Sequence, residues 1–163
     1  MKQLTRMAML TAIALTIFLV EAQIPPLLPV AGVKPGLSNI VTVYAVFALG
    51  PGEAAGILTG RVILGAVFSG QPSSLMYSAA GGALALGTMV LLRRVLAKNQ
   101  RWIAGCAGGV MHNLGQLAVA IWVTRTPALI SYLPVLVAAG LVAGLFTGLA
   151  AQALLARLPT GGK

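Results

Sequence analysis

The stretch that decides the fold is residues 102–123, WIAGCAGGVMHNLGQLAVAIWV. About 22 residues at about 1.5 Å each are enough for one helix to cross a bilayer. His112 and Gln116 are four residues apart and share one face of this predicted helix, and Asn113 flanks the same face. Because hydrocarbon offers these groups no hydrogen-bond partner, they must point into the protein or toward a ligand. We therefore expect them to help line a pocket near the middle of the membrane.

The composition of the whole chain is that of an integral membrane protein. Of its 163 residues, 58% are hydrophobic and only 8% are charged, whereas an ordinary soluble domain carries about 25% charged residues. In a soluble protein, the net charge of +9 would suggest a nucleic-acid partner. The basic residues cluster at predicted helix ends, however, so membrane lipid headgroups and membrane orientation explain them better. No nucleic-acid partner is expected.

Apolar runs separated by Pro, Gly and basic residues predict six helices in a single membrane domain, residues 1–163. The second predicted helix is short for a full span, and the sixth is expected to be broken or entered late near Pro134. The expected fold class is an all-α integral membrane protein with a six-transmembrane-helix bundle. The predicted helices cover residues 4–24, 37–50, 53–69, 73–98, 102–123 and 129–158.

Six spans would place both chain termini on one side of the membrane. The opposite loops hold only Lys34 and Arg125. The positive-inside rule therefore places both termini, and the loop between the fourth and fifth helices, in the cytoplasm. The Lys and Arg residues on this side number eight: Lys2, Arg6, Arg93, Arg94, Lys98, Arg101, Arg157 and Lys163.

Small residues recur at four-residue spacing in three predicted helices, a spacing that permits close helix packing in lipid. We interpret the glycine seams of the third and sixth helices as internal packing. The alanine seam of the first helix fits internal packing and a partner protein equally. These seams consist of Ala8 and Ala12, Gly56 and Gly60, and Gly140, Gly144 and Gly148.

Arg61 is the most costly residue of the chain, because an arginine at a helix centre costs about 2.5–3.5 kcal/mol on insertion scales. We expect it at a depth similar to that of His112, roughly 15 Å from the cytoplasmic helix ends. Glu21 lies near the outer end of the first helix, with Lys34 and Asn39 at the outer loop. The candidate binding residues, in the middle and outer half of the bundle, are Glu21, Lys34, Asn39, Arg61, His112, Asn113 and Gln116.

Two interpretations of this set stay open. In the first, Glu21 neutralises Arg61 and the amides tie neighbouring helices together. In the second, the set surrounds an outward-opening pocket with excess positive charge, suited to a partly apolar ligand that carries an acidic or carbonyl group. For Arg61 and His112 we favour the second, because ionisable residues inside a membrane mark functional sites by default.

Signals for an enzyme are weak. The chain has no Asp, and its two Glu residues are far apart, whereas magnesium–diphosphate chemistry uses several clustered carboxylates. There is no Walker loop, CxxC, HExxH or GxSxG motif, and one His cannot build a metal site. We therefore expect a non-catalytic protein without metal or cofactor.

Several segments resemble the Gx transporter family, which is often labelled heptaprenyl diphosphate synthase component I. The resemblance covers almost the whole chain, and GVKPGLSNIV and HNLGQL are its most specific parts. The matching segments are LTRMAMLTAIAL, GVKPGLSNIVTVYAVFALGPGEA, GRVILGAVFSG, SLMYSAAGG, VMHNLGQL and YLPVLVAAGLVAGLFTGL.

That family is similar to the S components of energy-coupling-factor (ECF) transporters, which are six-helix substrate-binding proteins of the bacterial inner membrane that take up vitamins or precursors. The resemblance implies docking of Ala8 and Ala12 on a transmembrane coupling protein, with two ATPases supplying energy. It also implies that the loop at residues 25–36 gates the site. The synthase label implies something different, an accessory membrane subunit of heptaprenyl or polyprenyl diphosphate synthesis.

Overall fold

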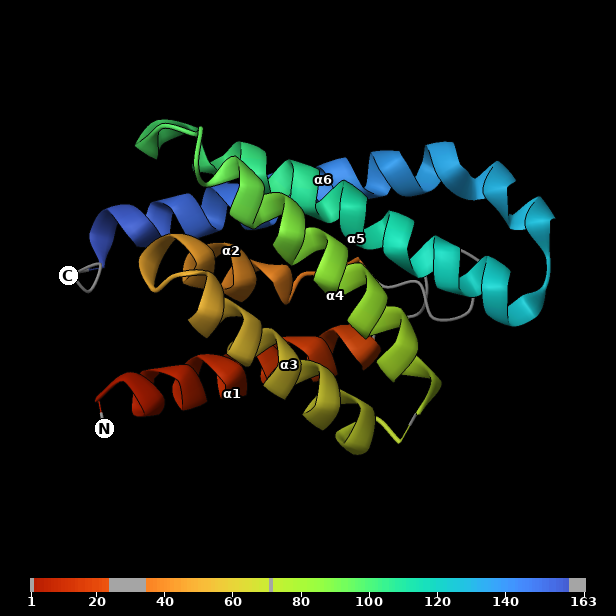
Figure 1. The fold of residues 1–163 in the computed structure, drawn as a ribbon, viewed down its shortest axis with the longest axis horizontal. Coiled ribbons are helices and arrows are strands. Elements are labelled where there is room, and N and C mark those ends of the chain that lie inside the picture. The colour runs from red at the N-terminus through yellow and green to blue at the C-terminus, as the bar shows by residue number, and fades with distance from the viewer. Residues whose placement is uncertain (1, 24–34, 71, 159–163) are drawn as a thin grey trace.

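All secondary structure in the described part of the chain is helical. The structure is a computed structural model, and it describes residues 2–23, 35–70 and 72–158. Two 3-10 segments, η1 (Lys98–Gln100) and η2 (Pro127–Tyr132), precede the last two helices. The six α-helices are α1 (Lys2–Gln23), α2 (Asn39–Ala48), α3 (Pro51–Phe68), α4 (Ser73–Leu92), α5 (Arg101–Thr124) and α6 (Leu133–Arg157) (Figure 1).

Helix boundaries follow the local chemistry of Gly and Pro. Gly50 has a φ of 135°, which L side chains rarely adopt, and it lets the chain turn sharply between α2 and α3. Pro51 then opens α3, because a proline fixes φ at a helical value and its missing N–H would be unpaired at that position anyway. Pro134 lies in the first turn of α6 for the same reason. The late start expected near Pro134 is therefore observed, after η2.

The fourth helix ends earlier than the sequence predicts. α4 stops at Leu92, whereas the predicted helix continued to residue 98. Arg93 and Arg94 lie exposed after it, and Leu96 turns back to pack against the hydrophobic core. The chain therefore leaves the helix where apolar residues give way to charged ones.

Four of the helical segments are long and apolar enough to cross a membrane: α1, α4, α5 with η1, and α6 with η2. α2 has 10 residues, about 15 Å and so about half of a hydrocarbon core of about 30 Å. α3 has 18 residues, but it carries Glu53 and Arg61 and is not among the segments that are apolar enough to cross a membrane. The structure therefore supports a membrane helical bundle, in which four of the six helices of the described residues are candidate spans by length and composition.

Glycines bring helices into backbone contact. α5 packs on α6 where Gly105 meets Gly144 and Gly148, and where Gly109 meets Gly140. A Cβ atom at Gly105 would collide with the backbone of Gly148. The glycine seam of the sixth helix is thus internal, as predicted.

The seam of the third helix is internal as well. Gly56 of α3 faces the end of the Met7 side chain, and Gly60 faces Thr11, so both glycines pack against α1. The prediction that this seam holds the bundle together is confirmed.

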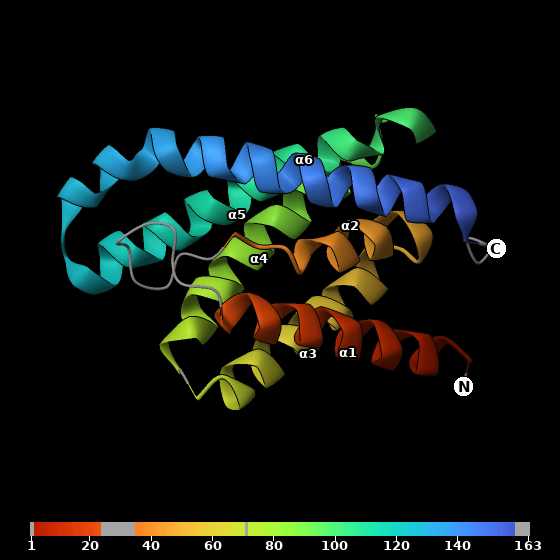
Figure 2. The ribbon, with the colours of Figure 1, turned by 180° about the vertical axis from the view of Figure 1, so that it is seen from behind.

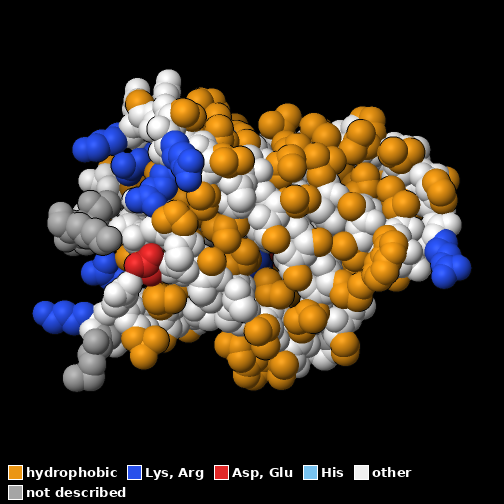
Figure 3. All heavy atoms as spheres, viewed as in Figure 1, with side chains coloured by type: hydrophobic (Ala, Val, Ile, Leu, Met, Phe, Trp, Pro, Cys, Tyr) orange, Lys and Arg blue, Asp and Glu red, His pale blue; other side chains and the backbone are white. Residues whose placement is uncertain are grey.

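The charged residues mark one end of the molecule. Both termini lie at that end (Figures 1 and 2), and the Lys and Arg side chains visible in Figure 3 gather there, apart from a basic side chain at the opposite end. Most of the basic residues that the sequence assigns to the cytoplasmic side are exposed; Arg101 is half-buried, with its guanidinium 5.3 Å from the centre of the Phe47 ring. The bundle therefore has one strongly basic end.

Candidate functional site

A buried polar cluster lies where the start of α2 meets α1, α3 and α5. Six of the seven predicted binding residues belong to the described part of the chain, and none of these six is more than 3% exposed. The seventh, Lys34, lies outside the described residues, as does most of the predicted gate loop. The cluster comprises Glu21, Asn39, Arg61, His112, Asn113 and Gln116.

α5 contributes three members of the cluster. Gln116 Nε2 lies 3.0 Å from His112 Nε2, as expected for side chains four residues apart on one helix face. Asn113 points to a different neighbour, and its Nδ2 donates to the carbonyl oxygen of Leu136 in α6 over 2.8 Å. The amide of Asn113 therefore ties α5 to α6, while His112 and Gln116 form a pair.

Gly36 joins α1 to α5 at the centre of the cluster. Its backbone N–H donates to Glu21 Oε1. A Cβ atom at Gly36 would lie 3.0 Å from His112 Cδ2 and 3.1 Å from Asn39 Nδ2. The φ of Gly36 is +79°, a left-handed value that favours glycine. The conformation and the crowding together fix a glycine at this position.

Arg61 of α3 is held by the same entry segment. Its Nη1 donates to Ser38 Oγ, at the N-terminus of α2. Its guanidinium also lies 5.8 Å from the centre of the Phe18 ring of α1, within cation–π range. The hydrogen bonds of Glu21 and Arg61 thus go to Gly36 and Ser38 and not to each other.

Several polar atoms of this cluster have no hydrogen-bond partner among the described residues. Each such atom costs about 1–3 kcal/mol when it is buried unpaired, and five residues contribute them. They provide hydrogen-bond donors and acceptors in one small region, which is the arrangement that a polar group of a ligand requires. The seven atoms are Glu21 Oε2, Asn39 Nδ2 and Oδ1, Arg61 Nε and Nη2, His112 Nδ1, and Asn113 Oδ1.

The formal charges of this cluster balance within the described residues. Glu21 carries one negative charge and Arg61 one positive charge. The excess of positive charge expected from the sequence arises because the predicted set also includes Lys34. Within the same residues, no three His, Cys, Asp or Glu side chains are grouped so that they could share a metal ion. The side chains of the cluster can therefore bind a ligand through hydrogen bonds and through charge.

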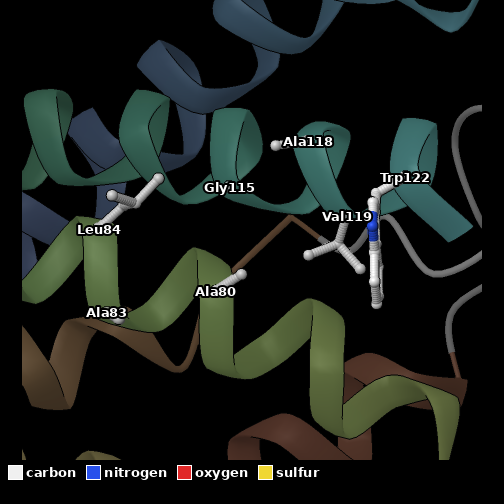
Figure 4. Close-up of a pocket in the computed structure, with 7 residues that line it drawn as sticks. All are labelled: Ala80, Ala83, Leu84, Gly115, Ala118, Val119 and Trp122. Atoms are coloured by element: carbon white, nitrogen blue, oxygen red, sulfur yellow. The ribbon is translucent and has the colours of Figure 1, made fainter. Parts of the chain in front are cut away.

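A separate apolar hollow lies outside this cluster, between α4 and α5 (Figure 4). Its volume is about 430 Å³, and Trp122 and Val119 stand at one end of it. Gly115 lines the hollow. It lies directly against the backbone of Ala80 and Gly81, so α4 and α5 are in close contact there. No member of the polar cluster lines this hollow.

Sequence reasoning missed Gly36, Ser38 and Gly81 as neighbours of the site. Gly36 and Ser38 hold Glu21 and Arg61, and a Cβ at Gly81 would lie 2.9 Å from His112 Nδ1. Gly36 and Ser38 could have been found from the sequence, since both lie in GVKPGLSNIV, one of the most specific segments of the family resemblance. Nothing in the sequence relates Gly81 to His112.

The two alanines predicted to dock a partner are both exposed on α1. Met7, Thr11 and Phe18 of the same helix face α3, where they contact Gly56, Gly60 and Gly65. Ala8 and Ala12 therefore do not serve the packing of α1 on the described bundle.

Comparison with known proteins supports the resemblance read from the sequence. The family model described as heptaprenyl diphosphate synthase component I matches residues 10–154. No curated protein and no solved structure matches the chain. The match covers five of the six described helices in full or nearly so, together with α1 from residue 10 onward.

Proposed function

The chain belongs to the heptaprenyl diphosphate synthase component I family, and we propose that it is a non-catalytic, substrate-binding membrane subunit of a small-molecule uptake transporter. It acts in the manner of the S components of ECF transporters. The observation that carries this proposal is the set of seven buried polar atoms around Gly36 that have no hydrogen-bond partner among the described residues. A purely structural network would pair these atoms within the protein.

The expected ligand is partly apolar and carries an acidic or carbonyl group. Two nitrogen atoms of Arg61 and the amide nitrogen of Asn39 have no hydrogen-bond partner in the part of the chain that the structure describes, and these donors suit an acidic or carbonyl oxygen. Residues of the apolar core lie close to them along the same helices, Val41 two residues after Asn39 and Ile57 one turn before Arg61, which suits the remainder of such a molecule. His112, Asn113 and Gln116 complete the pocket with Arg61 in this proposal, and Glu21, Asn39 and Lys34 belong to its outer rim.

In this proposal the protein spans the bacterial inner membrane six times, with the short α2 buried among the other helices, and both termini are cytoplasmic. Its partners are a transmembrane coupling protein, which docks on Ala8 and Ala12, and two ATPases. The exposure of these alanines supports docking, and the basic end of the molecule supports the orientation.

The test is native mass spectrometry of gently extracted protein, which detects a small molecule retained from the host. We expect a retained molecule in the wild type and its loss in Arg61→Gln and in His112→Ala. Arg125→Gln, at an exposed position, is the matched control and should keep it. Monodisperse elution on size exclusion establishes that each variant is folded.

Two outcomes would contradict the proposal. One is a folded Arg61→Gln variant that keeps the retained molecule at wild-type occupancy. The other is an Arg61→Gln or His112→Ala variant of which most molecules are unfolded, while the molecules that are folded bind the ligand with unchanged affinity. Either result would assign Arg61 to a structural network.

A second candidate is an accessory membrane subunit of heptaprenyl or polyprenyl diphosphate synthesis. The family description favours it directly. Co-purification discriminates the two, because a complex with ATPases and a coupling protein supports transport, whereas a soluble prenyltransferase partner supports the synthase subunit.

A further inference from the structure

An apolar cleft lies between α1 and α6. α2 packs against both of these helices, while α1 and α6 make almost no contact with each other in the described part of the chain. Figure 2 shows α2 in the gap between the two. The result is a lateral opening on the side of the bundle, independent of the buried polar cluster.

The cleft is wholly apolar along its length. Its volume is about 370 Å³, and all eight lining residues are Leu, Ile, Val or Tyr. Leu10, Ile13 and Ile17 form its α1 wall, Leu154 and Leu158 form its α6 wall, and Tyr44 lies on its α2 floor. A partner helix would bind poorly here, because helices in lipid associate through small residues that let their backbones approach closely. No small residue lines this cleft.

The end of the cleft is basic. Arg6 lies one turn before Leu10 and continues the stripe of Leu10, Ile13 and Ile17 on one face of α1. Arg157 lies in the last turn of α6, between Leu154 and Leu158. Both arginines are exposed. They belong to the start of α1 and the last turn of α6, and these two helix ends lie beside the termini (Figure 2). Two cations thus flank the mouth of an apolar channel.

The length of the cleft fits one leaflet of a bilayer. Arg6 and Ile17 are separated by eleven residues of helix, which is about 16 Å. Half of a hydrocarbon core is about 15 Å. A chain that starts at the arginines and ends beside Ile17 therefore spans a single leaflet.

We infer that this cleft binds an anionic phospholipid of the surrounding membrane. One acyl chain lies between α1 and α6 on the floor made by α2, and the headgroup phosphate lies between Arg6 and Arg157. The net charge of the headgroup selects the lipid: both rim residues are cations that bind phosphate, and an anionic headgroup, unlike that of phosphatidylcholine, brings no cationic group to oppose them. The lipid fills the gap that the protein itself leaves between its first and last helices.

The first experiment measures lipid preference. Protein purified in detergent is incubated with equal amounts of phosphatidylglycerol and phosphatidylcholine that carry the same acyl chains, and native mass spectrometry counts the bound lipid. We expect phosphatidylglycerol to be preferred in the wild type. The double variant Arg6→Gln/Arg157→Gln should lower phosphatidylglycerol binding by about 30-fold, toward the level of phosphatidylcholine.

The matched control removes the same charge at the same end of the molecule. Arg93→Gln/Arg94→Gln changes two exposed arginines after α4, a helix that does not pack against α1 or α6. It should leave the preference at the wild-type value. Equal loss in both double variants would overturn the inference, because the effect would then be one of net charge.

The second experiment needs no variant and so does not depend on the folding of one. Phosphatidylglycerol with a photoreactive group halfway along one acyl chain is crosslinked to the wild-type protein. We expect crosslinks to α1 residues from Leu10 to Ile17 and to Leu154 of α6. Unlabelled phosphatidylglycerol should compete with the probe. Crosslinks spread evenly over exposed side chains such as Phe68 and Phe146, or displacement only by a polyprenyl diphosphate or a partner helix, would overturn it.

Discussion

At the residue scale, Gly36 organises the polar cluster. It accepts a left-handed φ, lies against His112 and Asn39, and donates its N–H to Glu21. Any other residue would need both a strained backbone and space that His112 occupies. The buried acid and the buried histidine are therefore held in place by a residue that has no side chain.

Gly81 plays a similar part from the side of α4. A Cβ atom there would lie 2.7 Å from the carbonyl oxygen of His112. We expect Gly81→Ala to lower the free energy of unfolding by about 1–3 kcal/mol, because two helices would have to separate. Thermal unfolding in detergent, followed by circular dichroism, measures the change.

The control for this prediction lies on the same helix. Gly87 has no atom within 4 Å of the Cβ that an alanine would add. Gly87→Ala should therefore leave stability unchanged or raise it by about 0.5–1 kcal/mol through helix propensity. Equal melting temperatures for the two variants would mean that α4 and α5 do not approach so closely at Gly81.

At the element scale, α1 presents three different faces. Ala14, Phe18 and Glu21 are buried against the bundle. Leu10 lies on the stripe that lines the lateral cleft, and Ala8 belongs to the exposed small-residue stripe on the far side. Because so little of α1 is covered, it is the helix best placed to meet other molecules.

Widening the small stripe tests the docking role of α1. We expect Ala8→Leu/Ala12→Leu to leave melting temperature unchanged, since both side chains are exposed, and to abolish co-purification of a coupling protein, since leucines hold helices apart. Ile13→Ala, on the cleft face of the same helix, is the control and should retain the partner. Retention of the partner by the double leucine variant would refute docking at this stripe.

At the scale of the whole molecule, charge and packing are both polarised. Basic side chains gather at the end that holds both termini, and α5 and α6 form the most closely packed pair through their glycines. α1, at the other side, packs mainly on α3 and α2 in the described part of the chain. The bundle thus combines a rigid helix pair with a more open flank.

The charge asymmetry predicts the orientation in the membrane. In a Cys106→Ala background, Arg125→Cys should react with a membrane-impermeant maleimide added to intact cells, because it lies opposite the basic end. Arg94→Cys should react only after the membrane is permeabilised. Labelling of Arg94→Cys in intact cells would reverse the proposed orientation.

The sequence by itself determined the helical class, the six helices, the charge asymmetry and the identity of the costly polar residues. These follow from local quantities, namely the length of apolar runs, the position of Pro and Gly, and the cost of placing Arg61 or His112 in hydrocarbon. Only the tertiary structure decided which partners these residues find. Glu21 meets Gly36, Arg61 meets Ser38, and Asn113 meets Leu136, because hydrogen bonds between distant segments depend on how the helices pack. The same packing decided that α1 and α6 stay apart, since no local pattern records which two helices fail to touch.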